Sequence, residues 1–202
     1  MRIRPVVTIS EQDVPILAQQ LLDRMVADGF VPDALLGIAK AGALVVDSLP
    51  ETSGLARFTC TMQRPSTPAK QRAGLALRML KKLPYRLTSL LRFIQASARE
   101  RKTSVVPAPS ETLVRDIDII GAASRVQGFH RIAVVDDAVD SGVTLACVMA
   151  ALKQRLPAEV AVRSGAITRT RSRAKTIIQP DYFIYENTEC RFPWSPDYKG
   201  SS

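Results

Sequence analysis

The chain has little histidine and cysteine. His130 is its single histidine, and its three cysteines, Cys60, Cys147 and Cys190, lie far apart and form no paired motif. We therefore exclude a metal site built from several histidines and expect no histidine-based catalytic triad. The cysteine spacing matches neither a disulfide framework nor a zinc site, and it favours reduced thiols in a cytoplasmic protein.

Long apolar runs are also missing. No uninterrupted apolar stretch approaches the 18 or so residues that a membrane-spanning helix needs. Residues 1–5, which read Met-Arg-Ile-Arg-Pro, lack the apolar core of a signal peptide. We expect a cytoplasmic protein without a membrane partner. Its 202 residues suffice for a single domain, 1–202, with a full core.

Positive charge is present but unevenly distributed. The formal net charge is +9, yet residues 63–104 hold eleven Lys or Arg and one acid. The rest of the chain therefore carries 17 basic and 18 acidic side chains and is close to neutral. Two helices, 69–83 and 85–100, are predicted here around Pro84. This basic helical insertion, 63–104, is either a solvated face, an arm over a polyanionic substrate, a self-association surface or a nucleic-acid contact. Its only aromatics, Tyr85 and Phe93, favour an arm or an assembly surface over nucleic acid.

Apolar runs of strand length alternate with helix-length periodic segments, which indicates an α/β protein. A first helix is predicted over 8–30, with Ser10 as its N-cap. A turn is predicted over 186–190. The predicted strands are 34–38, 55–62, 132–135, 159–168 and 180–185, and helices are expected after residue 42, over 145–156 and within 111–126.

The stretch 131–145 organises the rest. Ile132 to Val135 reads as a strand buried on both faces, and Asp136 and Asp137 follow at its carboxyl end. Asp140 then opens a small-residue loop that leads into a helix. A helix N-terminus suits a phosphate, and an acid pair suits hydroxyl groups and a divalent cation. An Asp-Ser-Gly at such a junction can also serve only as a turn and cap. Three carboxylates within five residues favour the ligand site, because like charges this close destabilise one another without a partner.

Residues 134–145, Val-Val-Asp-Asp-Ala-Val-Asp-Ser-Gly-Val-Thr-Leu, resemble the phosphoribosyl-pyrophosphate loop of type I phosphoribosyltransferases, closest to the 6-oxopurine branch. The resemblance implies that Asp136 and Asp137 bind the ribose hydroxyls and Mg²⁺. It implies that Asp140 is a general acid or base near the purine. It also implies that the stretch from Asp140 through Ser141, Gly142, Val143 and Thr144 holds the 5′-phosphate.

A second strand, loop and helix resembles the pyrophosphate loop of the same family. After the strand 34–38 come Ala39, Lys40, Ala41 and Gly42, with Lys40 at the family's basic position and Ala41 in place of a usual glycine. In the 6-oxopurine branch the peptide bond before the basic residue is often cis, and we carry this expectation over to Ala39–Lys40. Taken alone, the same residues favour an ordinary βα turn, and it is their position before the Asp136 motif that favours the phosphate loop.

The C-terminal segment 180–196 resembles the hood and base pocket of bacterial and archaeal xanthine and hypoxanthine enzymes. Glu189 stands where that resemblance leads us to expect an aromatic residue that stacks on the base, and a carboxylate offers no stacking face. Arg169 ends the preceding strand at the position that would read the purine O6, although it can also be one of several surface arginines. Trp194 can equally be core packing. The expected base pocket comprises Arg169, Tyr185, Glu189, Phe192 and Trp194.

Together these patterns predict a type I phosphoribosyltransferase fold: a twisted, mostly parallel sheet flanked by helices, with a small C-terminal hood that the start of the chain can join. The expected ligands are phosphoribosyl pyrophosphate, Mg²⁺ and a small-molecule acceptor, most plausibly a 6-oxopurine, and we expect a homo-oligomer. Two alternatives stay open. One is a regulatory protein that binds phosphoribosyl pyrophosphate or a nucleotide and contacts nucleic acid or a partner through 63–104. The other is an enzyme with a non-purine acceptor.

Overall fold

A five-stranded sheet forms the centre of the computed structural model, which describes residues 5–61, 84–85, 88, 126 and 128–200. The strand order is β3-β2-β4-β5-β6, and every pairing is parallel. The strands are β2 (Ala34–Ile38), β3 (Ala56–Cys60), β4 (Arg131–Val139), β5 (Ala161–Arg169) and β6 (Tyr182–Glu186). All strand carboxyl ends therefore lie along one edge of the sheet, where α/β proteins place their ligands.

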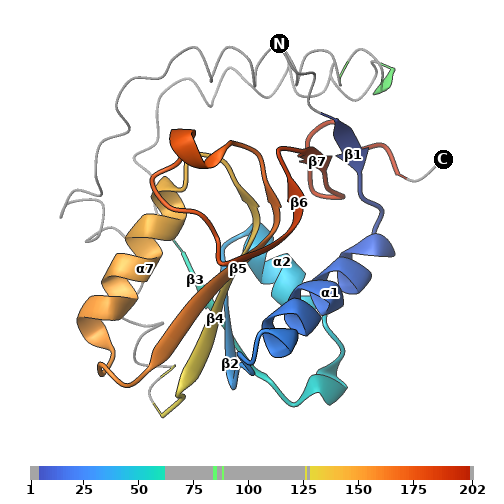
Figure 1. Cartoon of the computed structure of the whole chain (residues 1–202). Coiled ribbons are helices and arrows are strands. Elements are labelled where there is room, and N and C mark those ends of the chain that lie inside the picture. Colours follow the sequence, from blue (N-terminus) through green and yellow to red (C-terminus); the bar gives the residue numbers. More distant parts are fainter. Residues whose placement is uncertain (1–4, 62–83, 86–87, 89–125, 127, 201–202) are drawn as a thin grey trace.

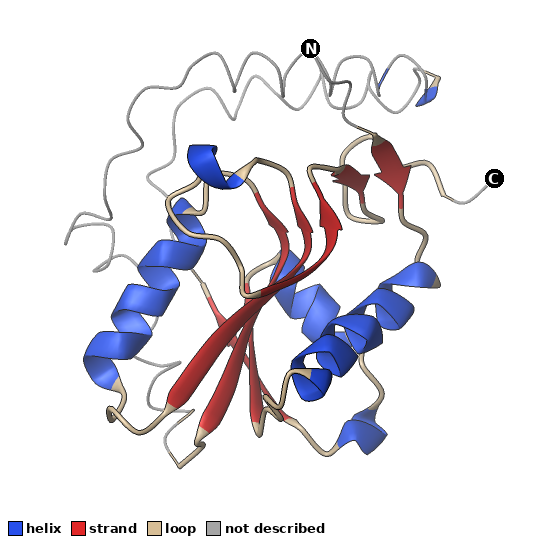
Figure 2. Ribbon diagram, viewed as in Figure 1, coloured by secondary structure: helices blue, strands red, loops and turns tan. Residues whose placement is uncertain are grey.

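Helices cover both faces of this sheet (Figure 1). The helices α1 (Asp13–Ala27) and α2 (Ala41–Asp47) lie on one face, and α7 (Val143–Arg155) lies on the other. The described residues also contain two short 3₁₀ turns, η1 (Glu51–Ser53) and η3 (Arg173–Lys175). Figure 2 shows this layered arrangement of helix, sheet and helix.

The strand β4 joins the two halves of the core. Ile132 and Val134 pack in the cluster that includes α7, whereas Ala133 and Val135 pack in the cluster beneath α1 and α2. Alternate side chains point to opposite faces of a strand, so an unbroken apolar run is what a doubly covered strand requires. The predicted fold class, a parallel sheet flanked by helices, is confirmed.

The start of the chain differs from the prediction. The segment 8–30 was expected to be helical throughout, but Thr8 belongs to the strand β1 (Val6–Thr8) and the helix α1 begins at Asp13. Ser10 and Asp13 cap it reciprocally: the Ser10 amide donates to the Asp13 carboxylate at 2.8 Å, and the Asp13 amide donates to Ser10 Oγ at 3.3 Å. The predicted contact between Ser10 and Asp13 thus forms, but the N-cap residue of α1 is Gln12, whose side chain makes no capping bond.

The C-terminal segment also departs from expectation. The turn predicted over 186–190 contains the start of β7 (Glu189–Arg191), which pairs in parallel with β1 in a separate two-stranded sheet. Val6 lies opposite Glu189, and the Glu189 amide donates to the carbonyl of Pro5 at 3.0 Å. Such short strands lack a sequence signal of their own, because each forms only by pairing with the other. This two-stranded sheet and the residues that follow β7 form the hood, which therefore contains both the C-terminal segment and the start of the chain.

Several predictions fall outside the described residues. The predicted helices over 69–83, 85–100 and 111–126 lie almost entirely there, so the domain division with an insertion at 63–104 stays a prediction. Among the described residues, no helix has the length and apolar character needed to cross a membrane.

A buried polar cluster holds the hood in place. The guanidinium of Arg191, 2% exposed, donates to Asp197 at 2.8 Å, to Thr8 Oγ1 at 2.9 Å and to Thr88 Oγ1 at 3.0 Å. The same guanidinium stacks on Tyr85, 4.4 Å from the ring centroid. These contacts link β1, β7 and the C-terminal tail to the chain around residue 85, so the hood depends on one charged side chain with several partners.

We expect Arg191→Ala to destabilise the protein by about 3–5 kcal/mol, because it leaves the Asp197 carboxylate buried without its cation. Urea unfolding would measure the loss. The matched control is Arg163→Ala, which removes an ion pair to Asp181 whose side chains are 54% and 33% exposed and which should cost at most about 1 kcal/mol. Equal losses in the two variants would show that the Arg191 cluster does not support the hood.

Candidate functional site

A cavity of about 460 Å³ opens at the carboxyl ends of β2 and β4. Two separate parts of the chain line it, and together they contain most of the residues predicted to hold phosphoribosyl pyrophosphate. The lining residues are Ile38 to Ala41 and Asp136 to Leu145. The structure thus brings the two predicted loops, about 100 residues apart in sequence, to one site.

The first loop is held against β4 by glycine. A Cβ atom on Gly42 would clash with the carbonyl oxygen of Val135 and would lie 3.0 Å from the Cα of Asp136. Only glycine allows the first turn of α2 to approach the strand this closely at the point where its acids begin. The peptide bond between Ala39 and Lys40 is cis, as the resemblance led us to expect.

The second loop is shaped by another glycine. Gly142 precedes α7 with φ of +77°, a left-handed conformation that glycine adopts readily, and a Cβ there would lie 3.0 Å from the amide nitrogen of Ile178. The Ile177 amide donates to the Ser141 carbonyl at 2.9 Å, so the segment after β5 fixes the outside of the loop. The start of α7 carries the positive end of the helix dipole and suits a phosphate.

The acid pair lies within the last part of β4, which continues to Val139, so the prediction that the strand ends at Val135 and that the acids follow it is wrong. The carboxylate of Asp136 accepts a hydrogen bond from the Asp137 amide at 2.9 Å, and that of Asp137 accepts one from the indole Nε1–H of Trp194 at 2.9 Å. Burial raises the pKa of Asp137 above its ordinary value, while the hydrogen bonds from Trp194 and neighbouring groups act in the opposite direction. Desolvation is the larger effect, so ionisation of Asp137 lowers the free energy of unfolding.

Asp140 lies beside the acid pair and has an unexpected partner. Arg171 binds its carboxylate in a bidentate manner, with Nε 2.6 Å from Oδ1 and Nη2 3.1 Å from Oδ2. The hydroxyl of Thr170 donates to Oδ1 at 2.9 Å. The Arg171 side chain is only 11% exposed. Sequence reasoning assigned no role to Arg171, because nothing local distinguishes it from Arg173. Its position directly after the β5 carboxyl end was the available signal.

The other predicted base-pocket residues lie in several places. Arg169 does not line the cavity: it donates to Gln179 at 2.6 Å and to Glu186, and it stacks on Phe183. Tyr185 packs against the core beneath α1, and burial raises its pKa. Glu189 lies in the hood strand β7. Phe192 is buried and stacks on Trp194, with ring centroids 5.0 Å apart and an interplanar angle of 5°. Of this set, Trp194 contacts the acid pair.

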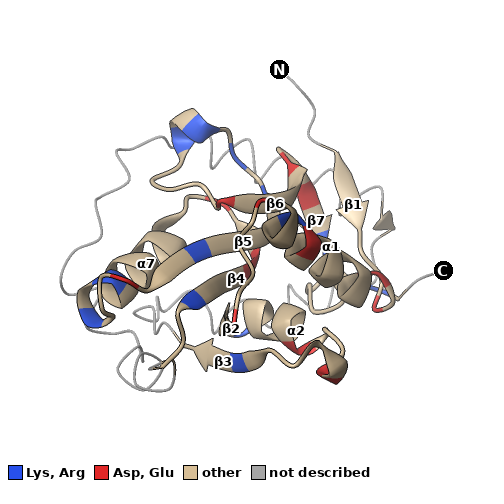
Figure 3. Ribbon diagram, turned by 60° about the horizontal axis from the view of Figure 1, so that its bottom comes forward, with Lys and Arg blue, Asp and Glu red and all other residues tan. Residues whose placement is uncertain are grey.

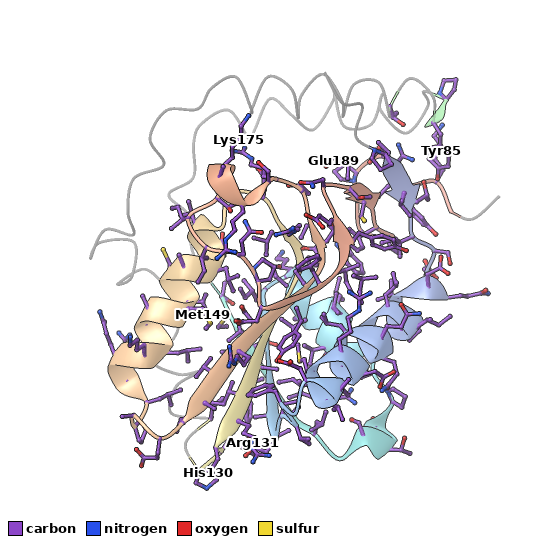
Figure 4. The ribbon with its side chains drawn as sticks, viewed as in Figure 1. Tyr85, His130, Arg131, Met149, Lys175 and Glu189 are labelled. Atoms are coloured by element: carbon purple, nitrogen blue, oxygen red, sulfur yellow. The ribbon has the colours of Figure 1, made fainter. Side chains whose placement is uncertain are left out.

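Acidic and basic side chains gather on different elements around the site. Figure 3 shows acidic residues where β4 ends and basic residues on the η3 turn, which carries Arg173 and Lys175. In Figure 4, Lys175 and Glu189 lie at the same end of the molecule, whereas His130 and Arg131 lie at the opposite end of β4. His130 therefore lies away from this cavity.

The carboxylates of the acid pair suit a magnesium ion whose other ligands come from a bound substrate and water. Among the described residues, no three His, Cys, Asp or Glu side chains are placed to hold a metal by themselves. Mg²⁺ is commonly bound through one or two carboxylates together with substrate oxygens and water. Asp136 and Asp137 supply hard oxygen donors on the cavity wall. These two residues could hold the ion once a phosphorylated ligand completes its coordination.

The model of the phosphoribosyl transferase domain family matches residues 73–199. No curated protein matches the sequence.

Among solved structures, a purine phosphoribosyltransferase from Pyrococcus horikoshii is 14% identical with a TM-score of 0.54, over 98% of each chain. A xanthine-guanine-hypoxanthine phosphoribosyltransferase from Helicobacter pylori is 17% identical with a TM-score of 0.54, over 94% of this chain and 92% of that one. A hypothetical protein from Neisseria gonorrhoeae with bound ppGpp is 14% identical with a TM-score of 0.54, over 96% and 91%. At such identities these likenesses establish the fold.

We expect Asp137→Asn to stabilise the ligand-free protein at pH 7. A gain of about 1 kcal/mol in the free energy of unfolding would raise Tm by roughly 2–4 °C. Folding raises the pKa of this carboxyl above its ordinary value of 3.8. Its contribution to stability is therefore fully present at pH values below 3.8 and is lost as the pH rises through the pKa of the folded state. Asparagine never ionises and keeps an oxygen for Trp194. Thermal melts at pH 7 and pH 4 would measure the gain, which should shrink at pH 4. The exposed Asp47→Asn serves as control, and a lower Tm for Asp137→Asn at pH 7 would contradict the assignment.

Proposed function

The chain belongs to the phosphoribosyl transferase domain family, and we propose that it transfers phosphoribose from phosphoribosyl pyrophosphate to a 6-oxopurine with release of pyrophosphate. One observation carries the proposal. A single cavity joins the loop at Lys40, the acid pair and the start of α7. These are the three kinds of group that a pyrophosphate, a ribose and a 5′-phosphate require.

We assign each part of the donor to one part of the cavity. Residues 141–144 at the N-terminus of α7 receive the 5′-phosphate, with Asp140 beside it, and the acid pair accepts the ribose hydroxyl groups. The loop at Lys40 contacts the pyrophosphate. Mg²⁺ held by Asp136 and Asp137 supplies positive charge that offsets the charge of the leaving group. The chain's own contribution is to position the donor and to bind the pyrophosphate through Lys40 and the backbone of its loop.

Asp140 is the proposed general base. The acceptor's ring nitrogen attacks C1 of the ribose as the bond to pyrophosphate breaks, and the reacting carbon gains positive charge in the transition state. The attacking ring carries a proton that must leave when it becomes bonded to ribose. Asp140 lines the cavity and can accept this proton.

Arg171 adds a second point of recognition. Because Arg171 and Thr170 bind the Asp140 carboxylate, an acceptor that donates to Asp140 must take the place of some of these bonds. The displaced guanidinium donors are largely buried and need a new acceptor atom. A 6-oxopurine supplies this atom, since its O6 lies on the same edge as N7. An amino group at that position would instead place its N–H donors against the N–H donors of the Arg171 guanidinium. We therefore propose that Arg171 recognises O6. Arg169, which the sequence analysis placed in this role, is the alternative candidate.

The setting of the enzyme is part of the proposal. Its cysteines form no disulfide, which accords with a cytoplasmic location. The segment 63–104 is proposed as a basic insertion that serves as an arm over the polyanionic donor or as a surface for homo-oligomer formation, and 180–196 as a hood over the acceptor.

Asp140→Asn should lower kcat by two to four orders of magnitude, roughly the share that general base catalysis supplies. Binding of phosphoribosyl pyrophosphate should largely survive, because the acid pair and the helix N-terminus remain. Pyrophosphate release would be assayed with hypoxanthine, guanine, xanthine, adenine, uracil and orotate. Release with at least one 6-oxopurine but not with adenine is the expected pattern. An unchanged kcat in the variant would remove Asp140 from the mechanism.

Arg171→Met should raise the KM of the 6-oxopurine about tenfold or more, as expected when a buried hydrogen bond to a charged group is lost. Arg169→Met tests the competing assignment, and Arg173→Met, on the exposed η3 turn, is the control. Steady-state kinetics of the three variants would rank them. A larger effect in Arg169→Met than in Arg171→Met would return the role to Arg169.

A further inference from the structure

The chain has one tryptophan, and it contacts the ribose site. The indole Nε1–H of Trp194 donates to Oδ2 of Asp137 at 2.9 Å. Indole is a donor only, and its one polar atom normally finds a partner when it is partly buried. Here that partner is the carboxylate of Asp137 on the cavity wall, which lies 57 residues earlier in the chain.

We propose that Trp194 is a positioning residue for Asp137: its indole N–H holds this carboxylate in the orientation that receives the ribose hydroxyl groups of the donor. The proposal rests on the proposed function, because the ribose is the ligand that Asp137 is assigned to bind. It gives Trp194 a role that stacking on an acceptor base would not provide.

The orientation of the Asp137 carboxylate depends on a hydrogen-bond donor of this kind. Asp137 is partly buried on the cavity wall, where its carboxylate loses part of its contact with water. Without a donor on Oδ2, the carboxylate is able to rotate toward solvent. The indole hydrogen bond opposes this rotation and compensates part of the desolvation of the ionised form.

Trp194 is itself fixed by the hood. Phe192 stacks flat on its ring and is 4% exposed. The Phe192 amide donates to Ser195 Oγ at 3.0 Å, and the Ser195 amide donates to the Phe192 carbonyl at 2.8 Å, which closes a tight turn around Trp194. Directly before this turn stands Arg191 with its buried polar cluster. A rigid support of this kind is what a positioning group requires.

The test variant is Trp194→Phe, which keeps an aromatic ring against Phe192 and loses only the N–H donor. We expect the KM of phosphoribosyl pyrophosphate to rise about tenfold, the usual scale for a lost hydrogen bond to a partly buried charged group. We expect kcat and the KM of the acceptor to change by about twofold at most, because the phenyl ring still offers a face to a base.

The matched control is Tyr182→Phe. This change also removes one aromatic donor from a carboxylate, since the Tyr182 hydroxyl donates to Asp28 Oδ2 at 2.8 Å, but it does so outside the cavity. Its kinetic constants should equal those of the wild type. Two results would overturn the proposal: an unchanged KM for phosphoribosyl pyrophosphate in Trp194→Phe, or a loss confined to the acceptor, which would make Trp194 a base-pocket residue alone.

Direct binding separates this inference from the proposed function. Calorimetric titration of wild type and Trp194→Phe with phosphoribosyl pyrophosphate and Mg²⁺ needs no turnover. If the wild type releases no pyrophosphate with any base yet binds the donor about tenfold more tightly than the variant, the proposed reaction fails and the positioning role stands. If both bind equally while the wild type is active, the positioning role alone fails. Emission of the single tryptophan should also change during the wild-type titration, and an unchanged emission would contradict the placement of Trp194 beside the donor.

Discussion

The close approach of the first turn of α2 to the end of β4 is the constraint on which the site depends. Gly42 lies so near Val135 and Asp136 that no side chain fits between them. This contact sets the loop at Lys40 beside the acid pair and makes one cavity out of two loops. The polar groups of the site are thus arranged by apolar packing: β4 is buried on both faces by α7 and by α1 with α2, so its carboxyl end has a fixed position at which to present Asp136 and Asp137.

The sequence predicted those parts of the structure whose signal is local. The strand at Ala34–Ile38 was predicted to the residue, and the two cavity loops were predicted from residue types at a strand-to-helix junction. The paired strands β1 and β7 were missed, since three residues at each end of the chain form a strand only by meeting the other. Arg171 was missed for a related reason. Its role depends on the direction of one side chain after β5, and the sequence offers Arg169, Arg171 and Arg173 with equal chemistry.

Both carboxylates that the proposed chemistry uses most accept hydrogen bonds from side chains that lie 30 to 57 residues later in the chain. Asp137 is held by Trp194 in the hood, and Asp140 is held by Arg171 and Thr170 after β5. The motif at 136–144 is therefore incomplete by itself. Its residue types can be recognised in a dozen positions, but their orientation is set by segments that the motif does not include. The Ile177 amide, which donates to the Ser141 carbonyl, adds a third such contact.

These partners differ in what a ligand must do to them. Trp194 can only donate, so its bond to Asp137 persists when the other carboxylate oxygen accepts a ribose hydroxyl, and the bond is useful in the bound state as well as the free one. Arg171 occupies both oxygens of Asp140, so an acceptor that needs this carboxylate must displace it and then satisfy the guanidinium. The first arrangement favours tight binding of the donor, and the second favours selection of the acceptor. Under the proposed function, donor affinity thus depends on the hood and acceptor choice on the segment after β5, so the two properties can change independently in sequence.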